Sequence, residues 1–355
     1  MTRRPTLADV AARARVSPTA VSLVLNDRPG RISAEAVARI RQAAVDLDYR
    51  PNQAARSLRL GKTHTVAFLS ADVTLTRFAS AMIRGLTDAA AERDHTILIA
   101  ETGPNAERAE GSLKALLDRK PDAVVIGLQK ARRIALPPVP VNVPLVLLNC
   151  TGEGDEATVL PAEYEAGRAI TRQLLDAGHR DIALLGWSPE LDSTPSLSAT
   201  LHDRFAGILD ELAAAGVAPV SRYDGGIEWE PSVGFDGVQA VWDAGLRPTG
   251  LICLNDRIAF GAYQGLAERG LRVAADVSVV SFDDEVLAGY LRPGLTTAAI
   301  PYEEMGRLAL ELALARQPAL TAEPAASEPE GAGEPAVRHV RVPMTLRVRE
   351  SVRPV

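Results

Sequence analysis

The side chains with the clearest chemistry in this chain are the arginines and lysines gathered in its first 62 residues. That segment holds 12 Lys and Arg against 5 Asp and Glu, a net charge of +7, whereas the other residues hold 27 against 40, a net charge of −13. A basic segment attached to an acidic body is typical of a chain in which one part alone meets a polyanion such as DNA. Charge by itself leaves a merely solvated basic arm as an alternative.

Motifs for catalysis, metal binding or nucleotide binding do not occur in the sequence. There is no P-loop, GxSxG, HExxH or paired-cysteine motif, and no GxGxxG follows the first apolar segment. The five histidines are scattered, and Cys150 and Cys253 lie in or beside apolar strand-like segments, as expected of reduced structural thiols. We therefore expect a protein that is not an enzyme and that holds no metal and no cofactor.

Three short helices are predicted in the basic segment, over residues 6–48. Thr6 with Asp9 three residues later forms a capping-box pattern, Ser17 followed by Pro18 marks a second start, and Ser33 marks a third. The first two helices are joined by a tight turn at Arg15-Val16, which predicts a helix-turn-helix arrangement. The following segment, 52–60, could form only about nine helical residues, fewer than the ~12–15 that an isolated helix needs.

From Thr65 onward, apolar strand-like segments alternate with helical ones. The predicted strands are TVAFLS, TILIAE, DAVVIGL, PLVLLN, DIALLG, TGLICLN and VSVVSFD, and the predicted helices cover 78–93, 105–118, 161–177, 201–215, 232–244 and 256–269. This alternation predicts an α/β fold of two doubly wound parallel-sheet subdomains, with a ligand cleft at the carboxyl ends of the strands.

Two further features complete the expected organisation. The segment 316–337, rich in Pro, Ala, Glu and Gly, is predicted to be a mobile surface loop. No run of 18 apolar residues and no signal-peptide pattern occurs, so we expect a cytoplasmic protein without a membrane partner.

The order of several motifs resembles the LacI/GalR family of bacterial transcription regulators. The head motifs are TLADVAARARVSPTAVSLVLN and RISAEAVARIRQAAVDLDYRPNQAARSLR, and the body motifs are AGHRDIALLG, DRFAG, LICLNDRIAFGA, VSVVSFDD, LTTAAIPYEEMG and LRVRES. The resemblance covers the chain except the 316–337 segment. It implies a DNA-binding head (1–50), a hinge helix (51–62) and a periplasmic-binding-protein-like core (63–355). Within the core we expect an N-subdomain of 63–160 and 294–316, a C-subdomain of 161–292 and 337–355, and a mobile loop at 317–336.

The resemblance also implies how DNA is bound. A homodimer, or a tetramer, would bind a pseudo-palindromic double-stranded operator, with the second helix of the head in the major groove. The residues that match the DNA-contacting positions are Ser17, Pro18, Thr19, Ser22, Leu23 and Arg31 in the head and Asn52, Ala55, Arg56, Leu58 and Arg59 in the hinge. Leu58 matches a minor-groove wedge. Leu23 could instead be a packing residue, and relatives often carry a polar or basic residue there.

The effector, in the same resemblance, binds in the cleft of the core. The matching positions are Phe78, Asn149, Arg204, Trp229, Asn255 and Asp283. Arg, Asn and Asp side chains suit sugar hydroxyls, which both donate and accept hydrogen bonds. The segment ADVTLTRFAS lacks the aromatic pair that many relatives have after the first strand, so a non-sugar effector such as a nucleoside stays open. The resemblance thus implies a repressor of carbohydrate genes, and the alternative is a ligand-binding protein without DNA function.

Overall fold

The computed structural model describes residues 5–25, 30–49, 62–71, 77–103, 106–316 and 339–355. The chain forms two compact units, Met1–His64 and Thr65–Val355, which are treated separately below. In the described ranges, no helix has the length and apolar character needed to cross a membrane. The expected hinge residues 51–61 and the expected loop 317–336 lie outside the described residues.

The first unit contains three helices within its described residues. They are α1 (Leu7–Ala14), α2 (Pro18–Leu25) and α3 (Ala34–Asp46). The predicted capping box is confirmed, because the Thr6 hydroxyl accepts from the Asp9 N–H and the Asp9 carboxylate accepts from the Thr6 N–H. Ser17 and Ser33 cap α2 and α3, each through a side-chain oxygen that accepts a backbone N–H. The left-handed residue Arg15, at φ 54°, ends α1 and turns the chain into α2.

A small apolar core holds these helices together. Its buried members are Val10, Ala11, Ala14, Val21, Val24, Ile40, Ala43 and Ala44. Because α2 contributes Val21 and Val24, one side of this helix faces the core and the other is free to meet another molecule.

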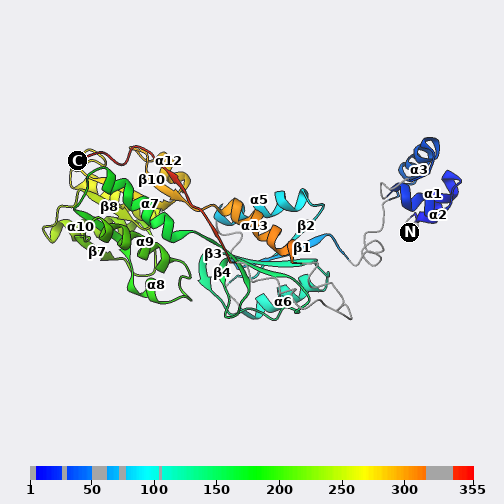
Figure 1. The fold of residues 1–355 in the computed structure, drawn as a ribbon, viewed down its shortest axis with the longest axis horizontal. Coiled ribbons are helices and arrows are strands. Elements are labelled where there is room, and N and C mark those ends of the chain that lie inside the picture. Colours follow the sequence, from blue (N-terminus) through cyan, green and yellow to red (C-terminus); the bar gives the residue numbers. More distant parts are fainter. Residues whose placement is uncertain (1–4, 26–29, 50–61, 72–76, 104–105, 317–338) are drawn as a thin grey trace, which may run out of the picture. The chain divides into compact units, whose positions relative to one another are not determined.

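The second unit begins with a six-stranded sheet in the order β11-β5-β4-β3-β1-β2. Its strands are β1 (Thr65–Ser70), β2 (Thr96–Glu101), β3 (Ala123–Arg133), β4 (Leu145–Thr151), β5 (Ala157–Pro161) and β11 (His339–Val342). Helices α5 (Arg77–Ala91) and α13 (Tyr302–Ala315) cover one face, and α6 (Ala106–Leu117) covers the other (Figure 1). Alternate residues of β1 therefore enter different cores: Val66 and Phe68 pack on the side of α5 and α13, and Ala67 and Leu69 on the side of α6.

A second six-stranded sheet has the order β12-β10-β9-β8-β6-β7. Its strands are β6 (Ile182–Trp187), β7 (Ser221–Asp224), β8 (Gly250–Cys253), β9 (Ser278–Asp283), β10 (Thr296–Ala299) and β12 (Thr345–Arg347), with β12 antiparallel to β10. The helices of this part are α7 (Glu163–Asp176), α8 (Pro189–Ser193), α9 (Leu201–Ala214), α10 (Pro231–Asp243), α11 (Asp256–Glu268) and α12 (Val286–Tyr290). The prediction of two doubly wound parallel sheets is confirmed.

The expected subdomain boundaries need correction at two places. Residues 294–300 were assigned to the N-subdomain, yet β10 pairs with β9 in the second sheet. Residues 339–342 were assigned to the C-subdomain, yet β11 pairs with β5 in the first sheet. Each of these strands has only four residues, so its sheet is decided by the neighbour with which it pairs rather than by a pattern of its own. The short strands β5, β7 and β10 were not predicted for the same reason.

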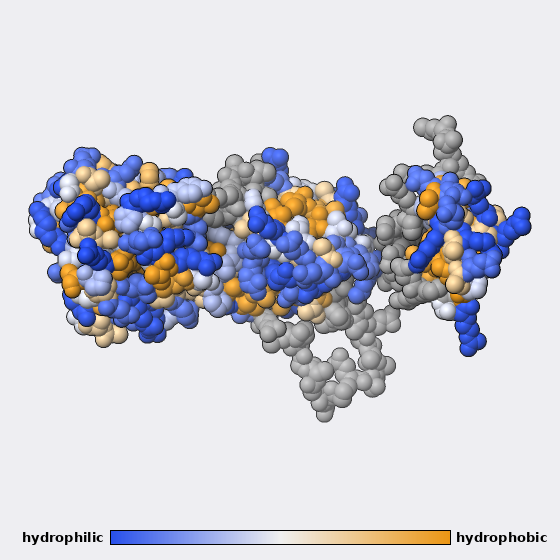
Figure 2. Space-filling model, turned by 90° about the horizontal axis from the view of Figure 1, so that it is seen from above, coloured by the Kyte–Doolittle hydropathy of each residue, from blue (hydrophilic) through white to orange (hydrophobic). Residues whose placement is uncertain are grey.

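Polar and charged side chains cover most of the surface of the second unit seen from above, and apolar side chains form small patches between them (Figure 2). The two cysteines are buried, and burial raises the pKa of Cys150 to about 12. Both observations fit the expected structural role of these thiols, because a thiol of raised pKa carries little of the reactive thiolate.

Candidate DNA-binding face and effector cavity

The exposed side of α2 carries most of the residues predicted to contact DNA in the head. Pro18, Thr19 and Leu23 are exposed. Leu23 is 41% exposed, although leucine is usually buried. Ser22 is half-buried, and Arg31 is exposed just before α3. Leu23 lies outside the apolar core of the described head, to which α2 contributes Val21 and Val24.

Ser17 lies at the start of the same face. Its hydroxyl oxygen accepts the Ala20 N–H, so one of its lone pairs is used in capping α2, while its O–H can still donate to a phosphate. The remaining predicted DNA contacts, Asn52, Ala55, Arg56, Leu58 and Arg59, lie outside the described residues.

A cavity of about 520 Å³ opens in the second unit between its two sheets. Of the predicted effector residues, it is lined by Asn149, Arg204, Trp229, Asn255 and Asp283. Phe78 lies in the first turn of α5, and its side chain is outside the described part of the structure. Asn149, Asn255 and Asp283 come from the carboxyl ends of β4, β8 and β9, where ligands bind in open α/β sheets.

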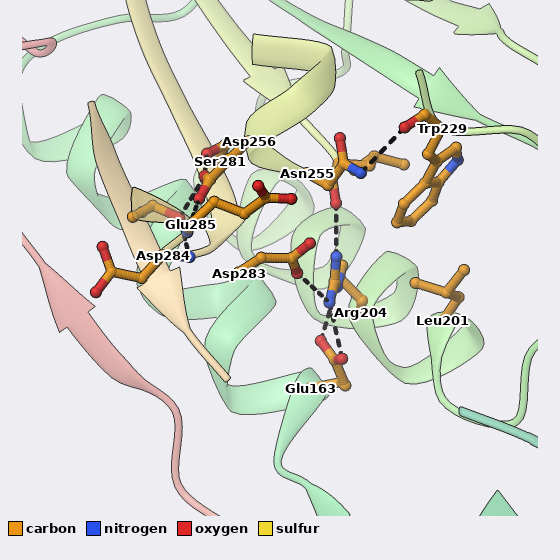
Figure 3. Close-up of polar contacts among 12 residues, drawn as sticks. Glu163, Leu201, Arg204, Trp229, Asn255, Asp256, Ser281, Asp283, Asp284 and Glu285 are labelled. Atoms are coloured by element: carbon orange, nitrogen blue, oxygen red, sulfur yellow. Dashed lines mark hydrogen bonds and ion pairs between the residues drawn. The ribbon is translucent and has the colours of Figure 1, made fainter. Parts of the chain in front are cut away.

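Arg204 forms the floor of this cavity together with two carboxylates. Its Nε and one terminal nitrogen donate to the two oxygens of Glu163 at 2.7 and 2.8 Å, and the other terminal nitrogen donates to the Leu254 carbonyl at 2.5 Å. The Asp283 carboxyl group points at the terminal nitrogen of Arg204 that also bonds Glu163, with an N–O separation of 3.7 Å (Figure 3). The side chains of Arg204 and Glu163 are only 3% and 2% exposed, whereas that of Asp283 is 18% exposed.

Burial dominates the electrostatics of the floor. It raises the pKa of Asp283 to about 7, with Arg204 opposing the rise and Glu163 and Glu285 adding to it. For Arg204, burial acts to lower the pKa but Glu163 outweighs it, so the pKa is raised and the guanidinium stays charged. The Tyr302 hydroxyl, which also lines the cavity, has a pKa raised by burial. The floor therefore holds one permanent cation and a carboxylate that is hard to ionise.

The backbone that presents Asp283 is held in an uncommon conformation. Asp283 and Asp284 have φ values of 104° and 52°, in the region that favours glycine. The buried carboxylate of Asp256 holds this segment by accepting from the Ser281 and Thr297 hydroxyls and from the Glu285 N–H. Figure 3 shows this second network beside the Arg204 cluster.

The side chain of Asp284 points away from Arg204 in Figure 3 and pairs with Arg349 at 2.6 Å, so it serves the structure rather than the cavity. Asp256 is fully buried, and this burial raises the pKa of its carboxyl group to about 8. These contacts make Asp256 and Asp284 structural carboxylates.

The two predicted asparagines have less hydrogen-bonding capacity than their identity suggests. The Asn149 amide donates both of its hydrogens, to the Leu128 and Gln129 carbonyls, which leaves only its oxygen for a ligand. Asn255 caps α11 by accepting the Ile258 N–H at 2.8 Å, and its nitrogen donates to the Trp229 carbonyl at 3.4 Å. Most polar atoms of the two side chains therefore hold the cavity wall in place, and few remain to bind an effector.

Trp229 places an aromatic face at the cavity. Its indole N–H donates to the Gly186 carbonyl at 3.1 Å, and the Arg204 guanidinium lies 5.7 Å from the centre of its ring. The ring is half-buried, in contact with the apolar core on one side. The N–H of Trp229 thus holds the indole in place, and the face of its ring can stack on a ring of a ligand.

Glu163 was missed by the sequence reasoning, as were Tyr302 and the organising role of Asp256. Glu163 is the first residue of α7, where an acidic side chain usually reflects the positive end of the helix dipole. Only the packing of α7 against α9 turns it toward Arg204. No local pattern in the sequence signals that meeting of residues 41 positions apart.

Two family models match this chain. Residues 6–52 match the bacterial regulatory proteins of the lacI family, and residues 171–352 match a periplasmic binding protein-like domain. These ranges correspond to the three-helix head and to most of the part of the core that carries the cavity floor.

Similar proteins include several repressors. The ribose operon repressor of Escherichia coli K12 is 31% identical over 89% of this chain and 94% of its own length. The ribose operon repressor of Haemophilus influenzae is 30% identical over 88% and 91%, and the transcriptional repressor PurR of Erwinia tasmaniensis is 30% identical over 88% and 90%.

Solved structures show the same fold. A lac repressor dimer bound to operator and an anti-inducer superimposes with a TM-score of 0.74 at 22% identity, covering 99% of this chain and all of that one. A lacI family regulator from Enterococcus faecium with bound ribose gives 0.59 at 23% identity, covering 82% and 99%. With both the head and the core matched, the chain belongs to the lacI family of bacterial regulatory proteins.

Proposed function

We propose that this protein is a cytoplasmic homodimeric repressor that binds operator DNA through the exposed side of α2 and is controlled by a sugar bound in the core cavity. The observation that carries this function is the combination of two recognition surfaces in one chain: an exposed helix face in a basic head and a polar cavity in the core. Similarity to ribose operon repressors supports both halves. The chain acts by binding and not by catalysis.

The side chains on α2 suit the major groove. The Thr19 hydroxyl can donate to or accept from a base edge, and Pro18 and Leu23 offer apolar contact to a thymine methyl group. Ser17 and Ser22 fit phosphate contacts, which position the helix without reading sequence. Arg31 adds a charge that can meet either a base or a phosphate. The bases read by this chain should differ from those read by relatives that carry a polar residue in place of Leu23.

The cavity suits a sugar because donors and acceptors stand close together beside an aromatic ring. Arg204 donates, Asp283 accepts, and Trp229 can stack on the apolar face of a pyranose or furanose ring. A nucleoside is the second candidate, because the same indole can stack on a base and PurR repressors are among the relatives.

Control of DNA binding would follow from movement of the two sheets of the core. In this conformation, the Ala199 N–H donates to the Ala131 carbonyl at 2.9 Å and the Arg133 N–H donates to the Pro195 carbonyl at 2.7 Å, joining the end of β3 to the segment between α8 and α9. An effector bound between the sheets would stabilise one distance between the end of β3 and the segment between α8 and α9. A coupling of about 1–3 kcal/mol would change operator affinity about 5- to 150-fold.

A direct test is fluorescence anisotropy with the full chain and duplexes tiled across the DNA upstream of its gene. We expect one pseudo-palindromic duplex to bind far more tightly than scrambled DNA. The logarithm of its affinity should fall with the logarithm of salt concentration by about 0.9 for each phosphate contact. Affinity that is the same for all duplexes would contradict the proposed operator function.

The effector class is tested separately by a thermal-shift screen of neutral sugars and nucleosides. A sugar that raises Tm supports the first candidate, and a nucleoside that alone raises Tm replaces it with the second.

A further inference from the structure

We propose that Glu163 sets the charge of the cavity floor, so that the floor accepts an uncharged hydroxyl-bearing group of the effector and excludes an anionic one. This inference deepens the proposed function and rests on it. The ligand class that it names is the neutral sugar, as opposed to a sugar acid or a sugar phosphate that directs its anionic group at Arg204.

The first support is the number of N–H groups that Arg204 has left. A guanidinium has five N–H donors, and in the described structure two are directed at Glu163 and one at the Leu254 carbonyl. Glu163 thus occupies the fork formed by Nε and one terminal nitrogen, a geometry that an acidic ligand could otherwise use. One N–H remains on each terminal nitrogen, and the Asp283 carboxyl group lies 3.7 Å from the terminal nitrogen that also bonds Glu163.

A second support is the balance of charge at the floor. Glu163 already neutralises Arg204, and Asp283 places a second carboxyl group 3.7 Å from a terminal nitrogen of the same guanidinium. An anionic group placed here would meet a guanidinium that is already neutralised and would be repelled by the Glu163 carboxylate, in a site where burial weakens screening. A hydroxyl avoids this repulsion, because it can donate to Asp283 and accept from Arg204.

Three other cations line the cavity outside this cluster. Lys130 is 3.9 Å from Glu228, and Arg257 pairs with Glu230 at 2.8 Å, both with largely exposed side chains. Arg132 lines the cavity from β3 in the first sheet. The inference therefore concerns the end of the effector that meets α9 and β9.

The packing of α7 on α9 fixes Glu163 in this position. Gly167, one turn after Glu163, approaches α9 so closely that a Cβ there would lie 2.5 Å from the Arg204 carbonyl oxygen. Gly207 approaches the Tyr164 carbonyl in the same manner from the other helix. With the two backbones in contact, the carboxylate of Glu163 has little freedom to leave the guanidinium.

The test uses formate as a small anion and the full-length Glu163→Ala variant, in which the space of the carboxylate is vacated. The matched control is Glu211→Ala, which removes a carboxylate bonded across the same two helices to Arg168 and Arg172, whose side chains are 40% and 48% exposed. Tm is measured with increasing sodium formate at an ionic strength held constant with sodium chloride.

We expect Glu163→Ala to melt below the wild type and to gain a saturable rise in Tm with formate, of about 3 °C at ten times the dissociation constant. The wild type and Glu211→Ala should show no such rise. An equal rise in the wild type, or none in Glu163→Ala, would overturn the inference. Glu163→Ser vacates nearly the same space and takes the place of the alanine variant if that variant does not fold.

Operator binding by the wild type is measured in the same preparations. Intact operator binding without the expected formate response overturns the charge assignment alone. The expected formate response without any operator binding overturns the proposed function alone.

Discussion

The exposed side of α2 and the floor of the cavity are two proposed recognition surfaces, and they are built in opposite ways. Pro18, Thr19 and Leu23 project into solvent from a helix that is held by other residues, Val21 and Val24. At the cavity, Arg204 and Glu163 are both buried and bonded to each other. The difference teaches that a side chain on α2 can change specificity without disturbing the fold, whereas a change at the cavity floor affects binding and stability together.

The largest effect should follow Arg204→Ala. This change leaves the Glu163 carboxylate buried without its cation and the Leu254 carbonyl without its donor. Breaking a buried ion pair from one side typically costs about 3–5 kcal/mol. Urea unfolding of the core should show a loss of that size, and a loss below about 1 kcal/mol would contradict the contrast between the two surfaces.

A second prediction concerns the pH dependence of stability. Burial raises the pKa of Asp256 to about 8 and that of Asp283 to about 7, from the ordinary value of 3.8. Above pH 3.8 the unfolded state releases both protons, whereas the folded state keeps them until the pH approaches these raised values. Stability from these groups is therefore present in full at low pH and is lost as pH rises toward 7–8, by up to about 1.4 kcal/mol per pH unit for each group.

Urea unfolding at pH 5, 6, 7 and 8 measures this loss. Asp256→Asn should flatten the pH profile relative to the wild type, even though the variant is less stable because it accepts fewer hydrogen bonds. Asp283→Asn should flatten the part of the profile below about pH 7, because above that pH the carboxyl is ionised in both the folded and the unfolded state. Profiles of equal slope for the wild type and both variants would show that these carboxylates titrate as in water.

On α2, Thr19→Ala should lower operator affinity by about 1–3 kcal/mol while changing the free energy of unfolding by less than about 0.5 kcal/mol. The physical reason is that the hydroxyl is exposed and is replaced by a small side chain of good helix propensity. Anisotropy titration and thermal melting of the same sample give both values. A melting temperature that falls together with affinity would remove the distinction between the two surfaces.

The smallest effect should follow Glu35→Gln on α3. Glu35 pairs with Arg39 at 2.9 Å, but the two side chains are 82% and 49% exposed. Solvent-exposed pairs at this helical spacing contribute about 0.3–0.5 kcal/mol. The unfolding free energy should change by no more than that, which makes this variant the reference for surface substitutions.

The sequence allowed much of the fold to be predicted because its signals are local. Thr6 with Asp9, Ser17 with Pro18, and Ser33 mark helix starts through hydrogen bonds made within one turn, and each start is confirmed. Long apolar strands such as β1 and β9 were recognised from their composition. Short strands such as β10 and β11 were not assigned to the correct sheet, because pairing partners far along the chain decide their place.

The cavity shows the same limit at the level of side chains. Positions resembling those of a family identified Arg204, Asn255 and Asp283, and the structure brings them to one cavity. Glu163 could not be found in this way, because its role depends on a close approach of α7 and α9. The resemblance assigns Asn149 a contact with the effector. No sequence pattern indicates that backbone carbonyls already accept both of its amide hydrogens.

The most direct test of the account is the operator affinity of the full chain measured with and without each neutral sugar that raises its Tm, in the wild type and in Asp283→Asn. The account predicts that at least one sugar changes wild-type affinity about 5- to 150-fold and leaves the affinity of the variant nearly unchanged. Wild-type affinity that no such sugar alters, or a variant that responds as the wild type does, would contradict it.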